Sequence, residues 1–208
     1  MKKRLHDKKA GIAILISLII ISLAEALFRS FVLKEAMLTT ANLGEQVAVI
    51  ILATTILILT AKGMDRACYI CYGAWAGYFI LDQLFELPGM IINLIANHSD
   101  PIANISSIIR LLTMVCIIVI GALLVEYMTD GTICNRAFNT FCVISILLLV
   151  VDIIISISGI FNAPTEMLKM HTTLVLFNNA YRLTMIFLFT FFAYDSAKHQ
   201  LKKANLTK

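Results

Sequence analysis

Long runs of apolar residues make up most of this chain, and short polar segments separate them. The runs cover residues 10–33, 46–61, 67–85, 104–125, 138–161 and 173–194. An α-helix needs about 20 such residues to cross the ~30 Å hydrocarbon core of a bilayer. In lipid, each spanning segment must satisfy its own backbone hydrogen bonds, which favours helices. We therefore predict an all-α fold, a polytopic integral membrane bundle of six transmembrane helices.

Composition agrees with this membrane assignment. The 208 residues are 60% hydrophobic and 14% charged, with a mean hydropathy of +0.88. A soluble domain carries about 25% charged residues. Because no long polar linker interrupts the runs, we predict one transmembrane domain over residues 1–208.

Two segments leave alternatives open. The first run follows a basic stretch and contains Ala24-Glu25-Ala26, which fits a secretory signal peptide with an A-x-A cleavage site. The run continues to residue 33, longer than a signal peptide needs, and this length favours an uncleaved first helix. The connection 86–103 contains Pro88 and Pro101, yet its middle, Met90 to Ala96, is apolar. It fits either an interfacial helix or a re-entrant lid.

The distribution of basic residues predicts the orientation. With both termini inside, twelve basic residues lie on the cytoplasmic side and two, Lys34 and Lys169, lie outside. The twelve are Lys2, Lys3, Arg4, Lys8, Lys9, Lys62, Arg66, Arg136, Lys198, Lys202, Lys203 and Lys208. This asymmetry is the positive-inside pattern, and it predicts a cell-membrane protein with cytoplasmic termini. It also explains the net charge of +4 without nucleic acid as a partner.

Ionisable residues inside the predicted spans are the main functional signal. They are Glu25, Arg29, Asp82, Arg110, Asp152 and Arg182, with Glu86 at the edge of the third span. A charge near the bilayer centre costs roughly 2.5–3.5 kcal/mol on insertion scales, so such residues face the interior, pair, or line a wet cavity. Counted at ~1.5 Å per residue, all of them fall in the outer half of the membrane.

Helical spacing predicts how these charges combine. Glu25 and Arg29 are four residues apart and should form an ion pair. Arg182 lies one turn from Asn178 and Asn179, and we predict Asp152 as its partner, because the two residues reach similar depths on adjacent helices. Two interpretations stay open: pairs that only lock the helices together, or a cavity that binds a ligand or ion.

The sequence contains no pattern that predicts catalysis. Neither H-E-x-x-H nor G-x-S-x-G occurs, and the histidines His6, His98, His171 and His199 lie outside the spans or at their edges. Cys68-x-x-Cys71 has metal or redox spacing, but no second ligand pair lies near it, and buried free thiols are the simpler interpretation. We expect neither an enzyme, nor a metal site, nor a cofactor.

We expect a protein that binds or transports a small solute through a polar pocket in the outer half of the bundle. The expected ligand-binding residues are Glu25, Arg29, Asp82, Arg110, Asp152, Asn178, Asn179 and Arg182. Size, six helices, inside termini and an outward pocket are similar to the substrate-binding membrane subunits of vitamin uptake transporters, without a shared motif. The alternative is a non-catalytic accessory or assembly protein whose buried charges are structural ion pairs. The expected partners are membrane lipid, a small solute and a partner membrane subunit.

Overall fold

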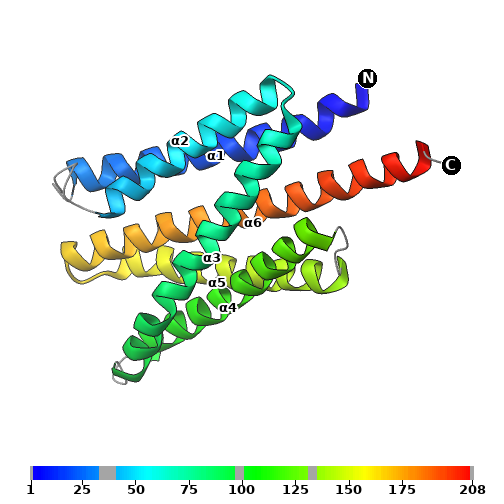
Figure 1. Cartoon of the computed structure of the whole chain (residues 1–208). Coiled ribbons are helices and arrows are strands. Elements are labelled where there is room, and N and C mark those ends of the chain that lie inside the picture. The colour runs from blue at the N-terminus through cyan, green and yellow to red at the C-terminus, as the bar shows by residue number, and fades with distance from the viewer. Residues whose placement is uncertain (1, 33–40, 97–100, 131–134, 207–208) are drawn as a thin grey trace. The chain divides into compact units, whose positions relative to one another are not determined.

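A computed structural model describes residues 2–32, 41–96, 101–130 and 135–206 (Figure 1). All regular structure in these ranges is helical, which confirms the predicted all-α fold. The helices are α1 (Lys2–Phe31), α2 (Ala41–Ala61), α3 (Asp65–Ala96), α4 (Pro101–Asp130), α5 (Asn135–Asn162) and α6 (Glu166–Leu206).

Four helices are long and apolar enough to cross a membrane. Their spanning stretches are Lys9–Phe31, Ile105–Leu124, Arg136–Asn162 and Glu166–Phe191. In α2 the apolar stretch is shorter, Gln46–Ala61. These lengths support the assignment as a polytopic helical membrane protein. That α2 and α3 also cross the bilayer stays a prediction.

Helix α3 is much longer than its predicted span. It continues through Pro88 to Ala96, so residues 86–96 extend this helix and do not form a separate connection. Proline removes one backbone donor and bends a helix, but membrane helices tolerate it where the freed carbonyl finds another partner. The prediction ended the span at residue 85 because Glu86 and Pro88 both resemble a helix end. The extension adds Glu86 to the ordered helix.

The chain divides into two compact units. The first contains residues Met1–Tyr72 and Phe187–Lys208, and the second contains Gly73–Ile186. In the first unit, α1 and α2 pack against each other, with Leu15, Leu18 and Ile56 buried. A tight turn ends α2: Gly63 has φ 70°, its N–H bonds to the Thr60 carbonyl, and the Met64 N–H bonds to the Leu59 carbonyl. This is a Schellman motif, in which glycine takes the left-handed position without steric cost.

The second unit holds most of α3, all of α4 and α5, and α6 up to Ile186. Helices α4 and α5 pack along each other. Phe79 of α3 meets Tyr181 of α6 edge to face, with ring centroids 5.9 Å apart. Helices α3 and α4 approach closely at Gly121, because a Cβ at this position would clash with the Ile80 side chain. The second unit therefore has an apolar core, and the polar residues described next lie in this unit.

Candidate functional site

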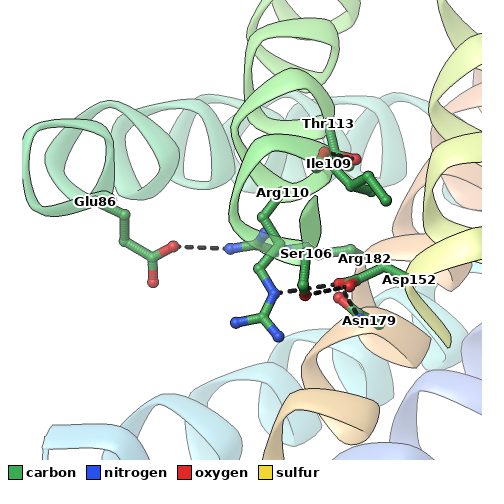
Figure 2. A network of polar contacts seen from close by, with 8 residues as sticks. All are labelled: Glu86, Ser106, Ile109, Arg110, Thr113, Asp152, Asn179 and Arg182. Carbon is green, nitrogen blue, oxygen red and sulfur yellow. Dashed lines mark hydrogen bonds and ion pairs between the residues drawn. The ribbon is translucent and has the colours of Figure 1, made fainter. Parts of the chain in front are cut away.

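Asp152 is the centre of a polar network inside the second unit. Its residue is 1% exposed, and its carboxylate accepts three hydrogen bonds (Figure 2). Ser106 Oγ donates at 2.7 Å, Asn179 Nδ2 at 2.7 Å and Arg110 Nε at 3.2 Å. Hydrogen bonds of this kind satisfy the polar atoms of a buried carboxylate. One acid on α5 thereby connects α4 to α6.

The local sequence explains why these groups meet. Ser106 and Arg110 are four residues apart, so they lie one above the other on the same face of α4. Asn179 and Arg182 are three residues apart on α6 and share a face in the same way. From these two faces, Ser106, Arg110 and Asn179 all reach the carboxylate of Asp152.

Arg182 pairs with Glu86, and the predicted Arg182–Asp152 pair was wrong. Arg182 Nη2 lies 2.7 Å from Glu86 Oε2. The side chain of Arg182 is 6% exposed, whereas that of Glu86 is 43% exposed. Depth along the helices was compatible with the predicted partner, but α3 reaches further than its predicted span and brings Glu86 beside Arg182. Asp152 pairs instead with Arg110.

Both arginines use only part of their hydrogen-bonding capacity. A guanidinium carries five N–H donors. Among the described residues, Arg110 donates only through Nε, and Arg182 only through Nη2. Figure 2 shows the two terminal nitrogens of Arg110 on the side away from Asp152. The Arg110 side chain is 28% exposed, so these nitrogens belong to a partly open group.

Asp82 and Gln83 extend the network along α3. Gln83 Nε2 donates to Asp82 Oδ2 at 3.1 Å, and Gln83 Oε1 is buried without a hydrogen-bond partner in the described part of the chain. Asp82 precedes Glu86 by four residues, and it interacts electrostatically with both Glu86 and Arg182. Asp82 therefore lies close to the network, although no ion pair among the described residues joins it to an arginine.

The other expected ligand-binding residues are Glu25, Arg29 and Asn178. Glu25 and Arg29 belong to the first unit, where Arg29 Nη2 lies 2.8 Å and Nε 2.9 Å from Glu25 Oε1. The predicted ion pair between them is thus confirmed. Asn178 is exposed, unlike its neighbour Asn179, which is buried beside Asp152. Of the eight expected ligand-binding residues, the second unit gathers five in or beside the network: Asp82, Arg110, Asp152, Asn179 and Arg182.

Two participants were absent from the expected ligand-binding set. Ser106 has a sequence signal, because it lies one turn before Arg110 on the same helix face. Glu86 has a weaker signal, because it lies one turn after Asp82. It also lies just beyond the predicted end of the span. The signal of Ser106 lies inside the predicted span 104–125, whereas that of Glu86 appears only when helical spacing is continued past residue 85.

The network can bind and hold charge, and its groups are oxygen acceptors and nitrogen donors. Among the described residues, no group of three or more His, Cys, Asp or Glu side chains is placed to hold a metal ion. Cys68, Cys71, Cys116 and Cys142 are free thiols, and Cys134 lies outside the described residues. The oxygen acceptors and nitrogen donors around Asp152 and Arg182 suit hydrogen bonds to a polar or charged group.

No protein-family model, curated protein or solved structure matches this chain. Its function is therefore argued from the network itself.

Proposed function

We propose that this protein binds a small polar solute at the network of Glu86, Arg110, Asp152 and Arg182, and carries it across the membrane. The observation that supports this most is the small number of hydrogen bonds that Arg182 makes. It is buried, yet one acceptor, Glu86 Oε2, serves its five donors among the described residues. A solute that supplies acceptors to the remaining N–H groups would add charge-assisted hydrogen bonds, which are the stronger kind.

The surroundings of the arginines fit a solute site. Ionisable residues are rare in membrane segments, and those that occur mark substrate or ion pathways. A ligand site needs a few convergent polar groups in an otherwise apolar wall. Arg110 and Glu86 are partly exposed, and the apolar residues Phe79 and Met114 of the same unit are buried. The binding step requires no covalent chemistry, so we propose a binding and transport protein without enzymatic activity or cofactor.

We propose six spans in the cell membrane with both termini in the cytoplasm, which would place the network in the outer half. The asymmetry of basic residues supports this orientation. Reporter fusions after Met64 and Asp130 should read cytoplasmic, and a fusion after Ser99 should read external. An external reading at Asp130 would overturn this map.

Native mass spectrometry of protein purified in mild detergent tests the binding proposal. The wild type should carry an additional small-molecule mass that Arg110→Gln lacks. Arg29→Gln is the matched control, since it also removes a membrane arginine that pairs with an acidic residue. Equal bound mass in all three proteins, or none in the wild type, would contradict the proposal.

A second candidate is a non-catalytic accessory protein that assembles with a partner membrane subunit. The observation that favours it is the satisfied carboxylate of Asp152, which needs no ligand. Under this candidate, the network only locks α4, α5 and α6 together. Purified protein would then carry a partner subunit and no small molecule, and Arg110→Gln would lower stability without changing any bound mass.

A further inference from the structure

We propose that the solute is a zwitterion, with an anionic group held by Arg110 and Arg182 and an ammonium group held by Glu86 and Asp82. This inference rests on the proposed function and names the chemical class that the site would accept. Two features of the second unit carry it: donors and acceptors are both left over, and the network has more acids than bases.

The left-over donors belong to two neighbouring guanidinium groups. Arg110 and Arg182 interact electrostatically as like charges, so they lie near each other. Each gives one nitrogen to its acid, Arg110 to Asp152 and Arg182 to Glu86. The planar fork of a guanidinium matches a carboxylate or a phosphate group. The remaining N–H groups therefore suit an anionic group that both arginines can share.

The left-over acceptors lie on one face of α3. Glu86 Oε2 accepts from Arg182, and Oε1 has no partner among the described residues. Figure 2 shows this second oxygen directed away from the dashed contact. Asp82 lies one turn earlier and accepts from Gln83 through Oδ2 alone among the described residues. An ammonium group carries three donors and no acceptor, so it complements these oxygens.

Charge arithmetic selects a zwitterion over an ion of one sign. The network contains three acids, Asp82, Glu86 and Asp152, and two arginines, Arg110 and Arg182. An anion alone would add to an excess negative charge in a medium where uncompensated charge is costly. A cation alone would leave the arginine donors unfilled. A zwitterion fills both sets of groups and leaves the net charge unchanged.

The arginine of the first unit provides an internal contrast. Arg29 directs both Nε and Nη2 to one oxygen of Glu25 within the same helix. Arg110 and Arg182 each donate to an acid on another helix through one nitrogen. The open geometry is thus a property of the network and not of membrane arginines in this chain.

Two sources offer this chemistry: a free amino acid in water, and the headgroup of phosphatidylethanolamine in the bilayer. Both carry an anionic group and an ammonium group a few bonds apart. The experiment below has one arm for each source. Phosphatidylcholine is the matched lipid control, because its quaternary nitrogen has no N–H to donate to Glu86 or Asp82.

The first arm measures the thermal unfolding midpoint of the full chain in detergent with each of the common amino acids. The amino acid that stabilises most is then compared with two half-molecules. For leucine, these are 4-methylpentanoate, which lacks the ammonium, and leucinamide, which lacks the carboxylate. We expect the zwitterion to raise the midpoint by several degrees and each half-molecule to raise it far less.

The second arm compares nanodiscs of phosphatidylethanolamine with nanodiscs of phosphatidylcholine. Stabilisation by the first lipid alone identifies the headgroup as the source, and stabilisation by the amino acid in detergent identifies the soluble source. Glu86→Gln keeps the shape of the side chain and removes one charge. In this variant, the advantage of the zwitterion over its deaminated half-molecule should shrink several-fold.

The outcomes separate this inference from the function on which it rests. Half-molecules that stabilise as well as the zwitterion would overturn the zwitterion assignment. The zwitterion assignment would also fall if a small-molecule cell extract stabilised the wild type but not Arg110→Gln, while no amino acid and no phosphatidylethanolamine did so. The proposed function would then stand. No response to the extract, the amino acids or the lipid would overturn both.

Discussion

The two units of this protein pair their arginines differently, the first within one helix and the second between helices. In α1, Arg29 and Glu25 lie one helical turn apart and close on each other, with side chains 12% and 4% exposed. In the second unit, Arg110 and Arg182 reach acids that are 42 and 96 residues away in sequence. The contact between Arg29 and Glu25 lies within a single helix, whereas the contacts of the network require α3, α4, α5 and α6 in register.

This difference separates a local stabilising pair from a candidate binding site. An i,i+4 pair forms as soon as its helix forms, and both charges are satisfied within the same turn. A network across helices forms only with the tertiary structure, and its geometry can leave donors free. We therefore expect the network to be sensitive to substitution and the local pair to be tolerant.

The largest effect should follow from Asp152→Ala. This change removes the acceptor of three hydrogen bonds and leaves the partly exposed Arg110 without its paired acid. We expect a loss of about 3–5 kcal/mol in the free energy of unfolding. Thermal or denaturant unfolding in detergent measures it, and combining the change with Arg110→Ala should recover part of the loss. If Asp152→Ala alone were as stable as the wild type, Asp152 would not be the centre of the polar network.

The two neighbouring asparagines of α6 provide the next test. Asn179 donates to the carboxylate of Asp152 at 2.7 Å, whereas Asn178 is exposed. Hydrogen bonds to charged groups contribute about 1.5–3 kcal/mol, so Asn179→Ala should lower the free energy of unfolding by that amount. Asn178→Ala is the matched control and should stay within about 0.5 kcal/mol of the wild type. Equal losses in the two variants would contradict the placement of Asn179.

A smaller effect should come from the close approach of α3 and α4. A Cβ at Gly121 would clash with the Ile80 side chain, so Gly121→Ala forces that side chain to move. We expect a loss of about 1 kcal/mol, at the low end of the range for overpacking. Gly77→Ala is the control, because a Cβ there meets nothing within 4 Å. If Ile80→Ala does not relieve the loss in Gly121→Ala, the clash is not its cause.

The smallest effect should follow from removing both partners of the local pair. Glu25→Gln with Arg29→Gln leaves no charge behind, and i,i+4 pairs contribute about 0.2–0.5 kcal/mol in isolated helices. The free energy of unfolding of this double variant should lie within about 1 kcal/mol of the wild type. A loss as large as that of Asp152→Ala would erase the contrast between the two units.

The sequence predicts what depends on neighbours along the chain. The apolar runs predict helices because the bilayer fixes their length, and the Glu25–Arg29 pair follows from helical spacing alone. The predicted length of α3 was wrong, because a charged residue and a proline, Glu86 and Pro88, are typical of a helix end. In the structure, α3 continues through both. That error hid the partner of Arg182. Choosing between Glu86 and Asp152 requires distances between helices, and helical spacing carries no such information.

Ligand-dependent stabilisation tests the central claim most directly, namely that the network keeps donors free for a solute. The measurement is the unfolding midpoint of the wild type, Arg110→Gln and Arg29→Gln, with and without the small-molecule fraction of a cell extract. We predict that the extract raises the midpoint of the wild type and of Arg29→Gln by several degrees, and leaves that of Arg110→Gln unchanged. An equal rise in all three proteins, or a rise in none, would contradict the claim.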